Sequence, residues 1–268
     1  MGRRGVRVDE PGRWVFNRLA ADYRARPGYP DELVERLLAL AGGPGEPVAD
    51  LGAGSGLLAL PLARRGARVV AVEPAATMLE ALRGEAAGLP VETAHAPAED
   101  TGLPAGGFAL ALLADVLQWV DPERAGREAA RLLRAGGVLA VVEPRLAATP
   151  FQDALRALLA AENPRARPRA AARLPQLLAA ARARIEGREV FAHDVPLDGG
   201  RLEAVLRSLS LVGPALGPEA LARVVSGARH LAEVHGGARW VREIALTWGR
   251  VGPAAARRPG PRRRAGPR

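Results

Sequence analysis

The chain has 268 residues, 48% of them hydrophobic, and a formal net charge of +9. This length and apolar content suffice for a full core, so a wholly disordered chain is excluded. Cysteine and lysine are both absent. Their absence excludes thiolate nucleophiles, iron–sulfur clusters, Schiff-base lysines and phosphate loops that depend on lysine.

The excess positive charge lies at the two ends of the chain. Three arginines precede Val8 and six follow Ala256, so the formal charges between them balance. We expect a basic, disordered start over 1–12 and a disordered Arg/Pro/Gly tail over 251–268, with no specific nucleic-acid partner. No apolar run approaches the length of a membrane span, which predicts a soluble, cytoplasmic protein without membrane insertion.

The first predicted elements are helices. Apolar and aromatic residues at helical spacing predict one over 14–23. A second is predicted over 30–43, because Pro30 and Asp31 open the pattern and glycines end it.

From residue 47 onwards, apolar runs alternate with helical patterns. Strands are predicted at 47–51, 67–73, 89–96, 107–115 and 136–144, and helices at 57–66, 75–86 and 122–137. The alternation is typical of βαβ units, and the continuous apolar runs indicate strands buried on both faces. The prediction is an α/β fold with a doubly wound, mostly parallel, seven-stranded Rossmann-like sheet, whose ligands lie beyond the carboxyl ends of the strands.

The composition changes after Phe151. Helices are predicted at 153–162, 173–185, 201–210 and 218–234, and strands at 187–197 and 238–250. The late helices lack the βαβ rhythm and are expected to form a cap over the site. We therefore expect a single domain over 13–250, with a cofactor-binding core at 45–145 and the cap and last strands at 151–250.

A glycine-rich turn joins the first strand to its helix. Gly52, Gly54 and Gly56 have the spacing G-x-G-x-G, and Leu57 stands where a dinucleotide fingerprint has its third glycine. Asp50 would meet a pyrophosphate at short range, whereas it would attract a cation. S-adenosylmethionine, with its ammonium and sulfonium groups, fits this turn. Glu73, at the end of the second strand, is suited to bind ribose hydroxyls, both of a dinucleotide such as NAD and of S-adenosylmethionine.

Several segments together resemble the class I S-adenosylmethionine-dependent methyltransferases. They are VADLGAGSG, VVAVEPAATML, APAEDTGLP, FALALLADVLQWVD and RLLRAGGVLAVVE, with FNRLAADYRARPGYP near the N-terminus. The chain is most similar to the type-11 domain group, which includes trans-aconitate and ubiquinone/menaquinone biosynthesis enzymes. The resemblance implies S-adenosyl-L-methionine as cofactor and a methyltransferase activity on a small-molecule acceptor, through oxygen, nitrogen or carbon.

The resemblance also implies site residues. It places the methionine part of the cofactor near Asp50, Gly52 and Gly54, the ribose at Glu73, and the adenine near Met78, Ala98 and Glu99. Pro97 replaces the acidic residue that relatives commonly have before this Ala–Glu pair. The full set of expected cofactor contacts is Asp50, Gly52, Ala53, Gly54, Gly56, Glu73, Pro74, Met78, Ala98, Glu99 and Asp115. Substrate contacts are expected at Tyr23, Arg26, Tyr29, Trp119 and Arg145.

No catalytic residue is assigned, because displacement at an activated methyl group mainly requires positioning and exclusion of water. No metal site is expected, since His230 and His235 do not share a helical face well. Two other functions stay open: a catalytically silent cofactor-binding regulator and an NAD(P)-dependent oxidoreductase. The protein is expected to be a monomer or homodimer.

Overall fold

The computed structural model describes residues 13–163 and 173–252, so the predictions for 1–12 and for 253–268 lie outside the described residues. Seven strands and nine α-helices are present in the described part, with one short 3-10 helix. In chain order they are η1 (Arg13–Arg18), α1 (Ala20–Tyr23), α2 (Asp31–Ala41), β1 (Pro47–Leu51), α3 (Ala59–Arg64), β2 (Arg68–Val72), α4 (Ala76–Glu85), β3 (Val91–Ala94), β4 (Phe108–Ala114), α5 (Pro122–Leu132), β5 (Leu133–Leu146), α6 (Pro150–Glu162), α7 (Arg173–Ala181), β6 (Ala183–Leu197), α8 (Gly199–Ser208), α9 (Pro218–Val234) and β7 (Ala238–Val251).

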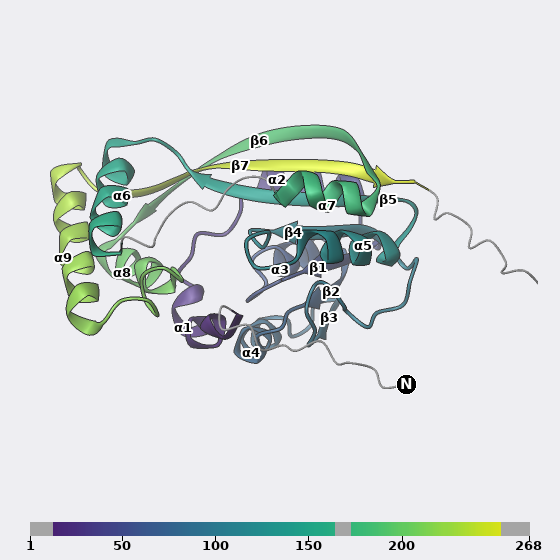
Figure 1. Cartoon of the computed structure of the whole chain (residues 1–268), viewed down its shortest axis with the longest axis horizontal. Helices are drawn as coiled ribbons and strands as arrows, with labels where there is room; N and C mark the ends of the chain where they lie inside the picture. The colour runs from purple at the N-terminus through teal and green to yellow at the C-terminus, as the bar shows by residue number, and fades with distance from the viewer. Residues whose placement is uncertain (1–12, 164–172, 253–268) are drawn as a thin grey trace, which may run out of the picture.

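All seven strands form one sheet in the order β3-β2-β1-β4-β5-β7-β6 (Figure 1). Neighbouring strands from β3 to β5 are parallel, and β7 is antiparallel to both β5 and β6. The strand order reverses between β1 and β4, so a crevice for ligands forms beyond their carboxyl ends. The predicted doubly wound, mostly parallel, seven-stranded fold is confirmed.

Alternate residues of the central strands face opposite layers of helices. Val48 of β1 and Leu110 of β4 pack with α2 and α3. Ala49 and Ala111, one residue further along these strands, pack with α5 and α7. Both layers are apolar, which explains why these strands read as continuous apolar runs.

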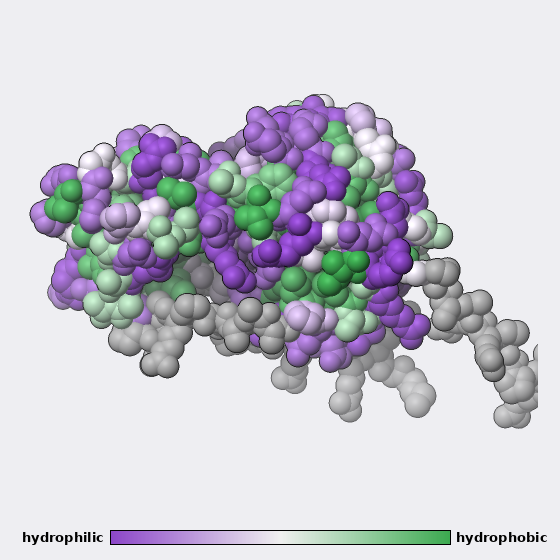
Figure 2. Space-filling view, turned by 90° about the horizontal axis from the view of Figure 1, so that it is seen from above, coloured by the Kyte–Doolittle hydropathy of each residue, from purple (hydrophilic) through white to green (hydrophobic). Residues whose placement is uncertain are grey.

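The last three strands are long and carry the sheet away from this core. β5, β6 and β7 have 14, 15 and 14 residues. They reach a separate group of helices, α6, α8 and α9, at the left of Figure 1. These helices and the adjoining strand ends enclose an apolar core of their own, which includes Phe151, Leu206 and Trp240. We call this unit the helical cap; seen from above, the molecule narrows between it and the main lobe (Figure 2).

Two boundaries differ from the sequence prediction. The helix predicted up to residue 137 ends at Leu132, and β5 begins at once, with a bulge where its register to β4 jumps from Leu133 to Val138. Gly136 has φ +75° in this bulge, a conformation in which glycine avoids a steric penalty. The single helix expected at 14–23 is instead two short turns, η1 and α1.

The hydroxyl of Thr77 donates to the carbonyl of Asn17 at 3.1 Å, which holds the η1 turn against α4.

None of the helices in the described part of the chain has the length and apolarity that a bilayer crossing requires.

Candidate functional site

The glycine turn after β1 has a conformation that requires glycine. Gly52 and Gly54 have φ values of +83° and +57°. A Cβ on Gly52 would lie 2.6 Å from Cγ1 of Val116, which is far closer than van der Waals contact. The N–H groups of Gly52 and Ala53 donate to the carbonyl of Val72 at 2.8 and 3.0 Å, so the end of β2 fixes the turn.

Glu73, the residue after β2, holds the same turn from the other side. One carboxylate oxygen accepts the N–H of Gly54 and the other accepts the N–H of Ala75, both at 2.9 Å. The side chain is 7% exposed. Hydrogen bonds to a carboxylate are stronger than those between neutral groups, so Glu73 is a principal support of the turn.

Asp50 lies beneath the turn, 2% exposed, with its carboxylate accepting a hydrogen bond from the N–H of Ala59 at the start of α3. Burial, together with the nearby charge of Glu73, raises the pKa of Asp50 to about 7. Gly56 is enclosed as well, because a Cβ there would meet Leu60 and Leu82 at 3.0 to 3.1 Å. Asp50 and Gly56 therefore shape the turn from inside the protein.

An open cleft lies over the turn; we call it the cofactor cleft. It contains about 620 Å³ of space, part of which is open to solvent. Its lining residues are Phe16, Tyr23, Gly52, Gly54, Glu73, Pro74, Met78, Ala98, Glu99, Ala114, Asp115, Val116, Trp119 and Val120. Three of these residues are acidic and none is basic. The cleft therefore favours a ligand with positive charge.

Eight of the eleven expected cofactor contacts line this cleft. Asp50, Ala53 and Gly56 do not, and they act from behind the turn. Glu99 stands opposite the turn, 9% exposed, where its carboxylate accepts the N–H of Asp121 at 2.9 Å. The Ala–Glu pair after Pro97 thus forms part of the lining of the cleft.

A second, larger pocket opens between the main lobe and the helical cap; we call it the cap pocket. It contains about 1120 Å³ of space, part of which is open to solvent. Its lining residues are Phe16, Tyr23, Arg26, Asp115, Gln118, Trp119, Arg156, Leu159, Ala160, Leu209, Ser210, Leu211 and Val212. Four residues line both this pocket and the cofactor cleft: Phe16, Tyr23, Asp115 and Trp119. The two spaces therefore meet at a seam formed by these side chains.

Aromatic rings build most of the seam. The rings of Phe16 and Trp119 meet edge to face with centroids 5.0 Å apart, and Phe16 makes a similar contact with Tyr23 at 6.5 Å. Burial raises the pKa of Tyr23. A seam of this kind excludes water from the point where two ligands would meet.

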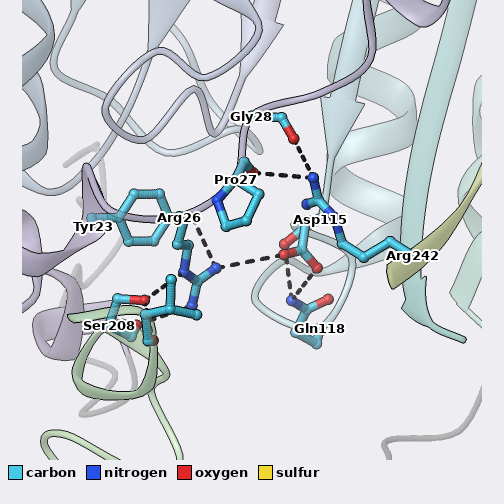
Figure 3. A network of polar contacts seen from close by, with 9 residues as sticks. Tyr23, Arg26, Pro27, Gly28, Asp115, Gln118, Ser208 and Arg242 are labelled. Atoms are coloured by element: carbon cyan, nitrogen blue, oxygen red, sulfur yellow. Dashed lines mark hydrogen bonds and ion pairs between the residues drawn. The ribbon is translucent and has the colours of Figure 1, made fainter. Parts of the chain in front are cut away.

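Asp115 is the charged member of the seam (Figure 3). It follows β4 directly and has φ +54°, a strained conformation for a residue with a side chain. The carbonyl of Asp115 accepts a hydrogen bond from Gln118 Nε2 at 2.8 Å, and its carboxylate lies 3.8 Å from Nη1 of Arg26. Burial raises the pKa of Asp115, and the charge of Arg26 lowers it in part.

Arg26 connects the seam to the helical cap. Its Nε and Nη2 donate to the hydroxyl and the carbonyl of Ser208, at the end of α8, both at 3.0 Å. The guanidinium also stacks on the ring of Tyr23, 4.3 Å from the centroid. One side chain thus joins α8, Tyr23 and Asp115 (Figure 3).

Two of the expected substrate contacts lie outside both pockets. Tyr29 packs against the core layer of α2 and lies under the guanidinium of Arg242, 5.5 Å from its ring centroid. Arg145 is exposed on β5, opposite Glu243 of β7. Tyr23, Arg26 and Trp119 line the cap pocket, so three of the five expected residues come together.

Sequence reasoning missed two groups of residues near the site. The first is the cap wall of the pocket: Arg156, Leu159, Ala160 and residues 209–212. These residues follow no motif, and only the fold of the cap brings them to the seam. The second is Arg242, 9% exposed, which donates to the carbonyls of Pro27 and Gly28 and so fixes the segment that carries Arg26 (Figure 3).

Comparison with known proteins agrees with this geometry. Residues 49–141, the part that carries the glycine turn, Glu73 and Asp115, match the methyltransferase domain family Methyltransf_11. This part of the chain is therefore similar to a methyltransferase domain. The fold expected from the sequence is confirmed.

Relatives agree with this assignment. Uncharacterized methyltransferases of Mycobacterium tuberculosis and Mycobacterium bovis are 44% identical over 120 residues, which are 44% of this chain and 47% of theirs. The matched stretch thus spans about half the length of these curated relatives. A proposed type II methyltransferase from Anaeromyxobacter dehalogenans has a similar structure, with a TM-score of 0.64 and 26% identity over 85% of this chain and 99% of that one.

The YcgJ protein of Bacillus subtilis shares the fold, with a TM-score of 0.57 and 16% identity over 83% of this chain and 99% of that one. At this identity the likeness concerns the fold alone.

Proposed function

We propose that the protein is a methyltransferase that uses S-adenosyl-L-methionine, bound in the cofactor cleft, to methylate a small molecule in the cap pocket. The observation that carries this proposal is the charge of the cleft: Glu73, Glu99 and Asp115 line it, and no lining residue is basic. S-adenosylmethionine has an ammonium and a sulfonium group, which such a cleft attracts. A pyrophosphate would be repelled.

Each side of the cleft has a role in this proposal. The glycine turn lets the backbone come close to the methionine part of the ligand. Glu73 lines the cleft directly after β2, the position from which a carboxylate binds ribose hydroxyls in nucleotide sites. Met78 and the Ala98–Glu99 pair form the walls suited to adenine.

The mechanism follows from the seam between the two pockets. The sulfonium supplies an activated methyl group, so the protein must hold the acceptor in line with it and keep water out. Phe16, Tyr23 and Trp119 are placed for both tasks, because they line the cleft and the cap pocket at once. Good positioning of this kind lowers a barrier by roughly 7 to 11 kcal/mol.

Calorimetry with S-adenosylmethionine, S-adenosylhomocysteine and NAD tests the proposal. We expect both sulfur ligands to bind and NAD not to bind. Binding of NAD alone would favour an oxidoreductase, and failure of both sulfur ligands to bind would refute the cofactor assignment. Release of S-adenosylhomocysteine with a panel of metabolites then separates an enzyme from a catalytically silent cofactor-binding regulator.

For the methyl acceptor, we predict only that it is a small molecule. The cap pocket supports this size class, because it lies between two lobes that are joined through Arg26. The narrower resemblance to trans-aconitate and quinone-biosynthesis enzymes is not part of the proposal.

A further inference from the structure

The composition of the cap pocket indicates which chemistry an acceptor would bring. Six of its lining residues have large apolar side chains: Phe16, Trp119, Leu159, Leu209, Leu211 and Val212. They come from both lobes. Leu211 is 44% exposed, although large apolar side chains are usually covered. The body of a molecule that fits these walls is apolar.

The two cations of the cap pocket are already bound within the chain. Arg26 donates to both oxygens of Ser208 and to the hydroxyl of Tyr23. Arg156, on α6, pairs with the carboxylate of Asp153 and reaches the carbonyl of Ala147 at 3.4 Å. An anionic acceptor would therefore have to compete with these partners.

Asp115 is the one carboxylate among the residues that line the cap pocket. One of its oxygens accepts from Gln118 Nε2 at 3.4 Å, and the other lies 3.8 Å from Nη1 of Arg26. Of its side chain 40% is exposed, and the residue lines both the pocket and the cofactor cleft. The charged and titratable groups around it are Arg26, Arg242, Tyr23 and Tyr29. Its carboxylate thus reaches the place where the acceptor and the cofactor meet.

We infer that the cap pocket binds an uncharged, largely apolar acceptor with a hydroxyl or amine group, and that Asp115 accepts the proton of this group during transfer. This inference rests on the proposed function. The acceptor's O–H or N–H donates to the carboxylate of Asp115. A lone pair on that oxygen or nitrogen forms the new bond to the methyl carbon. The carbon–sulfur bond breaks, with its electron pair remaining on sulfur, and the proton passes to Asp115.

The strained backbone of Asp115 agrees with this role. Residues at φ values near +54° carry an energetic cost that is found mostly at functional sites. The conformation directs the side chain to the seam, and Gln118 holds the carbonyl of the same residue. Asparagine tolerates this conformation about as well as aspartate, so Asp115→Asn removes the negative charge while keeping the backbone.

Binding of two matched probes tests the acceptor class. In the presence of saturating S-adenosylhomocysteine, we expect the protein to bind 2-naphthol at least tenfold more tightly than 2-naphthoate, by fluorescence titration. Asp115→Ala should remove this preference. Asp22→Asn, a neighbouring acid that lines neither pocket, is the control and should keep it. Tighter binding of 2-naphthoate, no binding of 2-naphthol, or an unchanged preference in Asp115→Ala would overturn the inference.

Turnover tests the proton transfer. With saturating S-adenosylmethionine and either 2-naphthol or 2-naphthylamine, we expect Asp115→Asn to lower kcat by about 100-fold or more, the usual contribution of a positioned base. The Kd for S-adenosylmethionine should rise by a smaller factor, because the cleft keeps Glu73 and Glu99. Equal kcat values in the wild-type protein and in Asp115→Asn would refute the role of Asp115. Binding of the probes to the wild-type protein without methylation would refute it as well. The calorimetric titration with S-adenosylhomocysteine distinguishes the role of Asp115 from the proposed function. If this ligand does not bind, the proposed function is refuted.

Discussion

The two lobes of the molecule use different means to make a binding surface. In the main lobe, the backbone forms the site: three glycines with positive φ, and N–H groups held by Val72 and Glu73. In the helical cap, side chains form it, through apolar residues of α6 and of the segment after α8. A site formed by backbone atoms tolerates few substitutions, because each one must preserve the backbone conformation. A pocket wall formed by side chains can change by substitution of one residue at a time.

This difference suggests a division of tasks. The main lobe contains the part that matches a methyltransferase domain, and we propose that it binds the cofactor. The cap adds a separate apolar core, centred on Phe151, Leu206 and Trp240, and one wall of the cap pocket. Specificity for the acceptor would then reside in the cap and in the seam residues. Changes in the two lobes should therefore affect different measurements.

The largest effect is expected from Glu73→Ala in the main lobe. The change removes two hydrogen bonds from backbone N–H groups to a carboxylate, each worth about 1.5 to 3 kcal/mol, and one of the acidic groups of the cleft. We expect the Kd for S-adenosylmethionine to rise about 100- to 1,000-fold by calorimetry. Glu203→Ala in the cap, which removes the partner of Arg207 and Arg229, is the control and should change Kd less than twofold. A similar Kd in both variants would contradict a cofactor site confined to the main lobe.

Asp50 should couple the stability of the main lobe to pH. Its pKa rises from an ordinary value of 3.8 to about 7 on folding, so the folded state binds the proton more tightly than the unfolded state. The stabilisation by this proton is present below pH 4 and is lost as pH rises to about 7. A shift of about three pH units corresponds to roughly 4 kcal/mol, which is an upper limit for the effect.

Asp50→Asn removes this dependence. In the absence of ligand, we expect the variant to gain stability over the wild-type protein by roughly 2 to 3 kcal/mol between pH 5 and pH 8, as measured by urea unfolding. It should also bind S-adenosylmethionine more weakly at pH 8, because a negative charge near the cation is lost. Asp153→Asn in the cap serves as the control. A variant whose stability tracks that of the wild-type protein at both pH values would show that Asp50 is not the titrating group.

The same contrast explains how much the sequence predicted. The seven strands, their mostly parallel arrangement and the glycine turn follow from local patterns, because buried strands and positive-φ glycines restrict which residues occur there. Glu73 and Asp115 were found because each follows a strand directly. The cap wall was missed, because Leu159 and Leu211 come from segments 52 residues apart and meet only after the cap has folded.

Two further differences have local physical causes. The helix predicted up to residue 137 ends five residues earlier, because Leu133 already pairs with Phe108 of β4. Tyr29 was expected at the substrate, but its ring packs on the core layer next to Arg242. An aromatic side chain is equally suited to pack in a core and to contact a ligand, so the residue type alone does not show which of these roles it has.

A smaller effect is expected from Arg26→Ala at the junction of the lobes. The change removes both hydrogen bonds to Ser208, the stacking on Tyr23 and the charge near Asp115. We expect a loss of about 1 to 2 kcal/mol in stability. Hydrogen exchange should increase mainly in α8, because its end is then no longer tied to the main lobe.

Two variants serve as controls for Arg26→Ala. Arg26→Lys should recover little of the effect, because an ammonium cannot reproduce the planar two-point contact with Ser208. Arg24→Ala removes an exposed arginine two residues away, which pairs with Glu85 at 3.5 Å, and should leave α8 unchanged. Increased exchange spread evenly over both lobes would contradict a local link.

The smallest effect is expected from Gly227→Ala within α9 of the cap. A Cβ there would lie 2.9 Å from Cδ2 of Leu158, the flexible end of a side chain on α6 that can rotate away. Alanine also favours a helix over glycine by about 1 kcal/mol, which offsets the repacking. We expect a change in stability within about 1 kcal/mol and unchanged affinity for S-adenosylmethionine. The counterpart, Gly52→Ala, meets Cγ1 of Val116 at 2.6 Å with φ +83°, and should lower that affinity strongly. If both substitutions proved equally mild, the main-lobe turn would not depend on its backbone, and the contrast between the lobes would fail.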